Sequence, residues 1–178
     1  RKLTEQKTFD EVWLIARRRE KLEKLAEDLT VPCRILSLDL TKQDALDEYA
    51  ALLKEYNPTI SILVNASGYG KFEAFSNIPL IEQLEMIDLN DKALVAMTYL
   101  SLPYLKKDSE VYQMGSLSSF QPVPYIAVYA ATKAFVLSFT RAVNAEIKKT
   151  GIKMMAVSPG WVKTEFFDHA VTDDSVIV

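Results

Sequence analysis

Ile60-Ser-Ile-Leu-Val-Asn-Ala-Ser-Gly68 (ISILVNASG) has the pattern of a short buried strand followed by a turn. The run Ile60–Asn65 is mostly apolar and too short to form a stable helix. Four similar runs lie on either side of it along the chain: Val12–Ile15, Arg34–Asp39, Val111–Gly115 and Lys153–Ser158. The sequence therefore predicts five strands.

Longer stretches with helical spacing of their apolar residues separate these runs: Arg18–Leu29, Lys42–Tyr56, Leu80–Leu105 and Ala127–Thr150. Thr41 is a candidate N-cap, and Gly151 is a candidate C-cap. Strict alternation of strands and helices implies parallel strands joined by right-handed crossovers, with helices on both faces. Without a repeat or a linker, residues 1–178 are expected to form a single α/β domain with a doubly wound parallel sheet.

The composition excludes several classes of protein. Of the 178 residues, 49% are apolar. The net charge of −3 does not indicate a protein that binds nucleic acid. One cysteine (Cys33) and one histidine cannot build a zinc site or an internal disulfide. No apolar run reaches the ~18 residues of a membrane span, and no secretory signal begins the chain. We expect a metal-free cytoplasmic protein that binds neither nucleic acid nor membrane.

Ligands of a doubly wound sheet bind outside the carboxyl ends of its strands. Small and polar residues collect at these ends: Ala16-Arg17, Asp39-Leu40, Asn65–Gly68, Gly115-Ser116 and Ser158–Gly160.

Tyr129 and Lys133 lie four residues apart on a predicted helix, so they share one face with Cβ atoms about 5–6 Å apart. The pKa of a tyrosine side chain is ~10. A cation ~4 Å away at an effective dielectric of ~20 lowers this pKa by up to about three units. Such a phenol can exchange a proton with an alcohol oxygen near neutral pH. Ser116 ends a strand upstream and is placed to donate to the same oxygen. The alternative is a chance surface pair of tyrosine and lysine.

Further motifs follow in order: Asp39-Leu40, Asn65-Ala66-Ser67-Gly68, Asn90, Ser116, Tyr129-x-x-x-Lys133, and Pro159-Gly160-Trp-Val162-Lys-Thr164. Together they resemble the short-chain dehydrogenase/reductase family across essentially the whole chain. The resemblance implies a Rossmann-like fold and hydride transfer between a nicotinamide cofactor and a small-molecule carbonyl or alcohol.

The same resemblance implies the residue roles. Tyr129 would be the general acid/base, Lys133 would lower its pKa and bind the nicotinamide ribose, and Ser116 would polarise the substrate oxygen, with Ser118 as the alternative serine. Asn90 would hold a water in a proton relay to Lys133. The remaining cofactor-binding residues would be Asp39, Leu40, Asn65, Ala66, Gly68, Pro159, Gly160, Val162 and Thr164. Family members commonly pair two long helices between subunits, so a homodimer or homotetramer is expected.

The end of the run Val12–Ile15 predicts the cofactor. A fold selecting NAD usually carries an acid there, whereas this chain continues with Arg17, Arg18 and Arg19. Arginine meets a 2′-phosphate with paired hydrogen bonds, which favours NADP(H) over NAD(H), with Arg17 first and Arg18 second. The alternative is that these arginines are the solvated start of a helix.

The family's first strand and glycine-rich turn are expected before Arg1, and its C-terminal elements beyond Val178. Two other functions stay open. One is a non-catalytic dinucleotide-binding sensor or scaffold, and the other is an isomerase, epimerase or dehydratase on the same scaffold.

Overall fold

The computed structural model describes residues 4–5 and 7–160. The chain divides into two compact units, residues 1–45 and 46–178, and each described strand pairs within its own unit. The expectation of one domain over residues 1–178 stays a prediction.

The first unit contains a pair of parallel strands joined by a helix. Strand β1 (Val12–Ala16) pairs with β2 (Cys33–Ser37), with Val12 opposite Cys33. Helix α2 (Arg19–Glu27) connects the strands and buries Leu22. Both strands therefore carry their carboxyl ends to one edge, where Arg17 and Arg18 follow β1.

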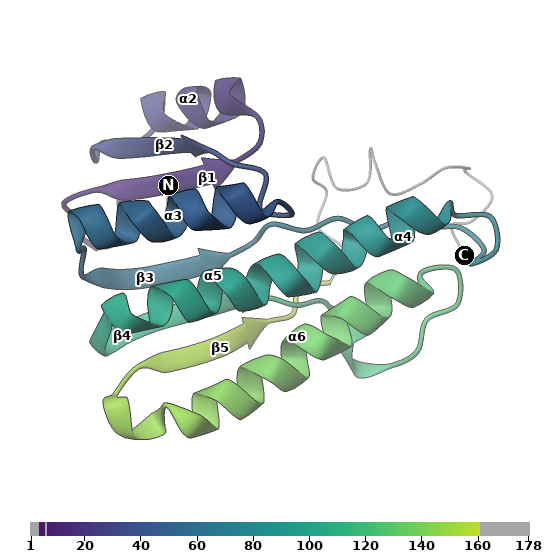
Figure 1. The fold of residues 1–178 in the computed structure, drawn as a ribbon. Coiled ribbons are helices and arrows are strands. Elements are labelled where there is room, and N and C mark those ends of the chain that lie inside the picture. Colours follow the sequence, from purple (N-terminus) through teal and green to yellow (C-terminus); the bar gives the residue numbers. More distant parts are fainter. Residues whose placement is uncertain (1–3, 6, 161–178) are drawn as a thin grey trace. The chain divides into compact units, whose positions relative to one another are not determined.

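The second unit contains a parallel sheet in the order β3-β4-β5. Its strands are β3 (Ile60–Asn65), β4 (Leu105–Met114) and β5 (Lys153–Val157). Helix α5 (Ala93–Ser101) packs against β3, and α6 (Ala127–Glu146) packs against β4 and β5, on the same face of the sheet (Figure 1). The predicted α/β class is confirmed: parallel strands alternate with helices, as in Rossmann-like folds.

The predicted helix Leu80–Leu105 is a series of shorter segments. It begins with α4 (Leu80–Ile87), continues through a π-helical turn, η1 (Asp88–Lys92), and then through α5, and it ends in a 3-10 turn, η2 (Leu102–Tyr104). Helix α3 (Gln43–Tyr56) begins just after the predicted cap Thr41. Within the described part of the chain, no helix is both long enough and apolar enough to cross a bilayer.

Strand β4 begins at Leu105, well before the predicted start at Val111. Its first part is polar and irregular: Asp108 has a φ of 69°, and its N–H donates to the carbonyl of Gly151 at 3.0 Å. Gly151 itself has a φ of 79° and ends the 3-10 turn η4 (Lys148–Thr150), which confirms the predicted C-cap. Pairing with neighbouring strands, rather than apolar alternation, therefore makes Leu105–Glu110 a strand.

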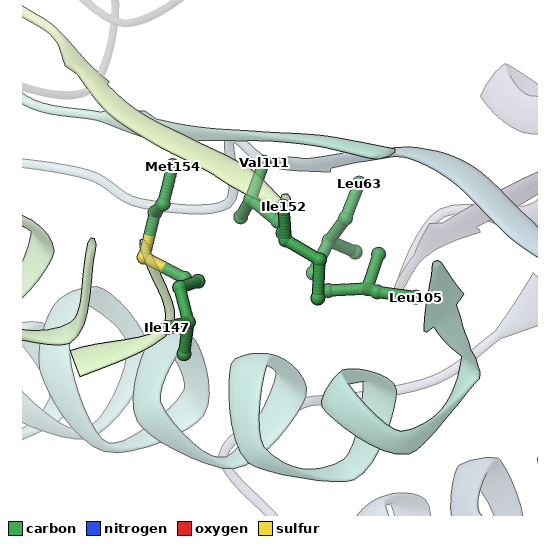
Figure 2. Close-up of a cluster of buried hydrophobic side chains, with 6 residues drawn as sticks. All are labelled: Leu63, Leu105, Val111, Ile147, Ile152 and Met154. Carbon is green, nitrogen blue, oxygen red and sulfur yellow. The ribbon is translucent and has the colours of Figure 1, made fainter. Parts of the chain in front are cut away.

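The main hydrophobic core of the second unit lies between its sheet and the end of α6. Figure 2 shows the buried side chains of this cluster: Leu63, Leu105, Val111, Ile147, Ile152 and Met154. They come from all three strands and from the two loops that flank η4. This core fixes the strands whose carboxyl ends carry the candidate site.

Replacing Leu105 with alanine is expected to lower the free energy of unfolding by about 2–5 kcal/mol, because a buried leucine lost from a packed core leaves a cavity. Leu105 is 5% exposed, whereas Leu80 on α4 is 69% exposed. Leu80→Ala is therefore the control, with an expected change within about 0.5 kcal/mol. Urea unfolding of both variants measures the difference, and equal midpoints would contradict the assigned core.

Candidate active site

Ser116 is held at the carboxyl end of β4 by a reciprocal pair of hydrogen bonds. Its Oγ accepts from the backbone N–H of Ser118 at 3.1 Å, and Ser119 Oγ accepts from the Ser116 N–H at 3.2 Å. This capping box begins the 3-10 turn η3 (Leu117–Phe120). The Ser116 side chain also hydrogen-bonds to Tyr129. These contacts distinguish Ser116 from Ser118, the alternative serine.

Tyr129 and Lys133 lie on the buried side of α6, 8% and 6% exposed. The Tyr129 ring packs against Phe72, with 6.3 Å between ring centroids. Lys133 Nζ lies 5.6 Å from the centroid of the Tyr129 ring and donates to the carbonyl of Met114 at 2.8 Å. The helical spacing therefore brings the phenol and the ammonium together inside the protein.

Burial dominates the electrostatics of this pair, and the expectation that Lys133 lowers the pKa of Tyr129 stays a prediction. Burial raises the pKa of the Tyr129 phenol, and a hydrogen bond from Ser116 acts to lower it. Burial also lowers the pKa of Lys133 to about 8, although the carboxylate of Asp91 acts to raise it. The ammonium donates to the Met114 carbonyl, and the negative charge of Asp91 acts on the lysine from the neighbouring η1 turn.

Asn90 acts as a clamp in this structure. Its Oδ1 accepts from the Tyr69 N–H at 3.0 Å, while Nδ2 donates to the Tyr69 carbonyl at 2.9 Å and to Thr132 Oγ1 at 3.0 Å. The Thr132 hydroxyl in turn donates to the carbonyl of Tyr129 at 2.7 Å. The side chain of Asn90 thus joins the η1 turn to the helix that carries the phenol and the ammonium.

Gly68 allows Asn90 and Lys133 to approach the end of β3. A Cβ at this position would lie 2.8 Å from Asn90 Oδ1 and 3.5 Å from Lys133 Nζ. No side chain fits there without displacing the clamp. The small residue predicted at this turn is therefore a packing requirement of the site.

Asn65 points into the protein. Its Nδ2 donates to Gln113 Oε1 at 2.9 Å and to Thr98 Oγ1 at 3.1 Å. Gln113 also donates to Thr98, at 2.8 Å. Asn65 therefore holds the ends of β3 and β4 to α5, and the exposed Ala66 follows it at the surface.

The segment after β5 lies against the one that carries Ser116. Gly115 N–H donates to the carbonyl of Val157 at 2.8 Å, and Leu117 N–H donates to that of Pro159 at 3.1 Å. Ser158 Oγ is buried and has no hydrogen-bond partner among the described residues. Pro159 and Gly160 follow it, while the predicted nicotinamide contacts Val162 and Thr164 lie outside the described residues.

In the first unit, Arg17 and Arg18 are exposed directly after β1. Ser37 Oγ donates to the carbonyl of Arg17 at 3.0 Å. Partial burial acts to raise the pKa of Asp39, but hydrogen bonds from Thr41 and the nearby charge of Arg17 hold it below its ordinary value. Leu40 is buried.

In each unit, taken by itself, residues that follow the strands carry groups of the kind that bind a nicotinamide dinucleotide. Exposed guanidinium groups at the end of β1 suit a phosphate. The Ser158 hydroxyl after β5, which has no partner among the described residues, leaves a polar group for an amide or a hydroxyl. Ser116, Tyr129 and Lys133 supply two hydroxyls and an ammonium suited to acid–base work on an oxygen.

Three residues of this site escaped the sequence reasoning: Tyr69, Asp91 and Thr132. Thr132 lies between Tyr129 and Lys133, and Asp91 is next to Asn90. Their positions beside predicted site residues were the only indication in the sequence that they belong to the site. The contacts that give them a role are tertiary, and only the structure reveals them.

A family model described as short chain dehydrogenase matches residues 6–175. An uncharacterized oxidoreductase of Staphylococcus epidermidis is 31% identical over 153 residues, which cover 85% of this chain and 66% of that protein. Sulfoacetaldehyde reductase 2 of Chromohalobacter salexigens is 33% identical over 159 residues, covering 86% and 63%. This chain thus spans slightly less than two thirds of these relatives.

Among solved structures, the closed form of a serine dehydrogenase complexed with NADP+ superposes with a TM-score of 0.81 and 30% identity. The match covers 90% of this chain and 66% of the other.

Proposed function

The chain belongs to the short-chain dehydrogenase family, and on that premise we propose that the whole protein is an NADP(H)-dependent oxidoreductase that interconverts a carbonyl and an alcohol. The observation that carries this proposal is the cluster of half-buried Ser116 with buried Tyr129 and Lys133, and with Asn90 clamped beside it. One relative is named as a reductase of an aldehyde and one structural neighbour as a dehydrogenase, and both names support hydride transfer.

The nicotinamide cofactor, when bound, supplies or accepts the hydride. In the proposed mechanism Tyr129 gives its hydroxyl proton to the substrate oxygen during reduction and takes it back during oxidation. Ser116, whose side chain hydrogen-bonds to the phenol in this structure, would donate its single hydroxyl hydrogen to the substrate oxygen. The Lys133 ammonium supports the negative charge that develops on Tyr129, and Asn90 holds the η1 turn against α6 through Thr132.

This function is tested by incubating the full-length protein with NADPH and a panel of aldehydes and ketones while the nicotinamide absorbance is followed. Oxidation of NADPH that depends on a carbonyl compound supports the proposal. Tight NADPH binding without turnover on any carbonyl would favour a dinucleotide-binding scaffold instead.

The preference for NADP(H) is proposed from the two exposed arginines after β1 and the absence of an acid at that position. The serine dehydrogenase neighbour was solved with NADP+, which supports the same cofactor. Hydrogen bonds to charged groups contribute about 1.5–3 kcal/mol each, so one lost arginine contact weakens binding about 10- to 100-fold.

Arg17→Ala in the full-length protein is expected to weaken NADPH binding about 10-fold or more while leaving NADH binding within about twofold, because only the 2′-phosphate is affected. Titration followed by nicotinamide fluorescence measures both affinities. The matched control is Arg19→Ala, since Arg19 pairs with Glu23 at 2.9 Å on the surface of α2. Equal loss for NADPH and NADH, or no loss, would make Arg17 part of the solvated helix start.

A further inference from the structure

Lys133 carries a positive charge in a buried position, and a buried ammonium requires hydrogen bonds and a counter-charge. Its Nζ donates to the carbonyl of Met114 at 2.8 Å, which supplies a neutral acceptor only. Ser116 and Tyr129 add hydroxyl groups but no negative charge at neutral pH. The charge must therefore be balanced from another element.

The side chain of Asn90 cannot balance it. The amide is neutral, and both Nδ2 hydrogens are used, by the Tyr69 carbonyl and by Thr132 Oγ1. Its Oδ1 already accepts from the Tyr69 N–H. Asn90 is therefore a structural clamp between η1 and α6.

Asp91, the next residue on the π-helical turn, has the properties that Asn90 lacks. Its Oδ1 is fully enclosed, and no described residue, Lys133 included, donates a hydrogen bond to it, so the two charges would act on each other through space. The η1 turn packs against α6, and Asn90 Oδ1 and Lys133 Nζ both lie close to the same point over Gly68. Asp91 and Lys133 each act on the pKa of the other: the carboxylate raises that of the lysine, and the ammonium lowers that of the acid.

Other charged groups on the surrounding elements are engaged elsewhere. On η1, Asp88 pairs with Lys92 at 2.7 Å at the surface. On α4, Glu82 pairs with Lys71 at 3.0 Å, and Glu85 is exposed. Further charges lie toward the far end of α6 (Arg141, Glu146) and on β5 (Lys153), while η3 carries none. Among the described residues, Asp91 is the charged group that acts on the lysine.

We propose that the Asp91 carboxylate is the buried counter-ion of the Lys133 ammonium, a positioning residue that keeps this lysine charged beside Tyr129. The proposal rests on the proposed function for its consequence in catalysis, but the pairing itself concerns only this chain's own residues.

The direction of the effect follows from the two groups. With Asp91 present, burial lowers the pKa of Lys133 to about 8, and the carboxylate limits this decrease. Asp91→Asn removes the negative charge, so the pKa of Lys133 falls further and the ammonium is lost at a lower pH. We expect a downward shift of about one pH unit, typical for a nearby charge at an effective dielectric of ~20. The alkaline limb of kcat/KM for carbonyl reduction moves by the same amount.

The test measures the pKa of Lys133 and the pH profile in the full-length protein. Lysine labelled with carbon-13 at the ε position reports the titration by NMR, and Lys133→Arg assigns the resonance. Asp91→Asn is expected to lower this pKa, and Asp91→Glu to restore it. Asp88→Asn is the matched control, because its carboxylate lies on the same turn but pairs with Lys92.

An unchanged Lys133 pKa in Asp91→Asn, with the fold intact by circular dichroism, would overturn the counter-ion assignment while leaving the proposed function untouched. A lowered pKa in a protein that reduces no carbonyl would support the assignment and count against the proposed function. A lowered pKa together with a shifted alkaline limb supports both. A kcat loss in Asp91→Asn that is equal at every pH, with no change in the lysine titration, would indicate packing alone and overturn the proposal.

Discussion

Tyr129→Phe is expected to lower kcat for carbonyl reduction by about 10³-fold or more in the full-length protein, with NADPH affinity changed by less than about threefold. The phenol is the proton donor of the proposed reaction, and general acid–base groups contribute about 10²–10⁴-fold to rates. Phenylalanine keeps the ring that packs against Phe72, so the pocket loses only the hydroxyl. Steady-state oxidation of NADPH and fluorescence titration measure the two quantities.

The control for this substitution is Tyr99→Phe. The Tyr99 ring is 76% exposed on α5, away from the buried face, and its hydroxyl should be dispensable. If Tyr129→Phe turned over at the rate of the unmodified protein, the general acid would have to be another group. Ser116 would then be the next residue to replace.

Lys133→Met is expected to lower kcat by about 10²–10³-fold and, in the same molecule, to raise the free energy of unfolding at pH 6 by about 1 kcal/mol. The loss of activity follows because the variant has no cation beside the phenol. The gain in stability follows because methionine removes a buried charge whose hydration was lost on folding. A site that reduces stability for the sake of activity behaves in this way.

The pH dependence of this gain has a definite sign. Burial lowers the pKa of Lys133 from 10.5 to about 8, so the folded protein binds this proton less tightly than the unfolded chain does. The protonated lysine therefore lowers stability by its full amount below pH 8, and the penalty disappears as the pH rises through the unfolded value. At pH 6 Asp91, with a pKa of about 7, is mostly protonated and does not oppose the gain.

Urea unfolding of Lys133→Met and the unmodified protein at pH 6 and at about pH 10 measures the difference, which should shrink at the higher pH. Loss of the hydrogen bond to the Met114 carbonyl offsets about 1 kcal/mol of the gain and is already included in the expected value. A variant that is both inactive and less stable at pH 6 would contradict the explanation that the buried charge of Lys133 lowers the free energy of unfolding.

The sequence predicted the arrangement of strands well because short apolar runs end in small or polar residues. Ile60–Asn65 was predicted with the bounds that the structure has, and the carboxyl ends collect the expected residues. It did not predict the start of β4, since Leu105–Glu110 is polar and forms a strand only through its neighbours. It also missed the π-helical turn, because Asp88–Lys92 lies between two helical segments and no residue type marks the local change of hydrogen bonding.

For the site, the spacing of Tyr129 and Lys133 was sufficient to place both on one buried face. It was not sufficient for the charges, because the pKa of a phenol depends on burial and on where the ammonium points. The hydrogen bond from Lys133 to the Met114 carbonyl of β4 and the packing of the η1 turn, with Asp91, against α6 are tertiary contacts. Such contacts join residues far apart in the sequence and leave no local pattern.

The capping box at Ser116 has a consequence for the direction of hydrogen bonding. The Ser118 N–H cannot reverse its role, so the oxygen of Ser116 is fixed as its acceptor. The single hydroxyl hydrogen of Ser116 is then free to be donated to Tyr129, with which the side chain hydrogen-bonds. A dipole oriented before a ligand arrives needs no rotation when negative charge forms on the neighbouring oxygen. The backbone of η3 thus sets the polarity of the first hydroxyl that a bound oxygen would meet.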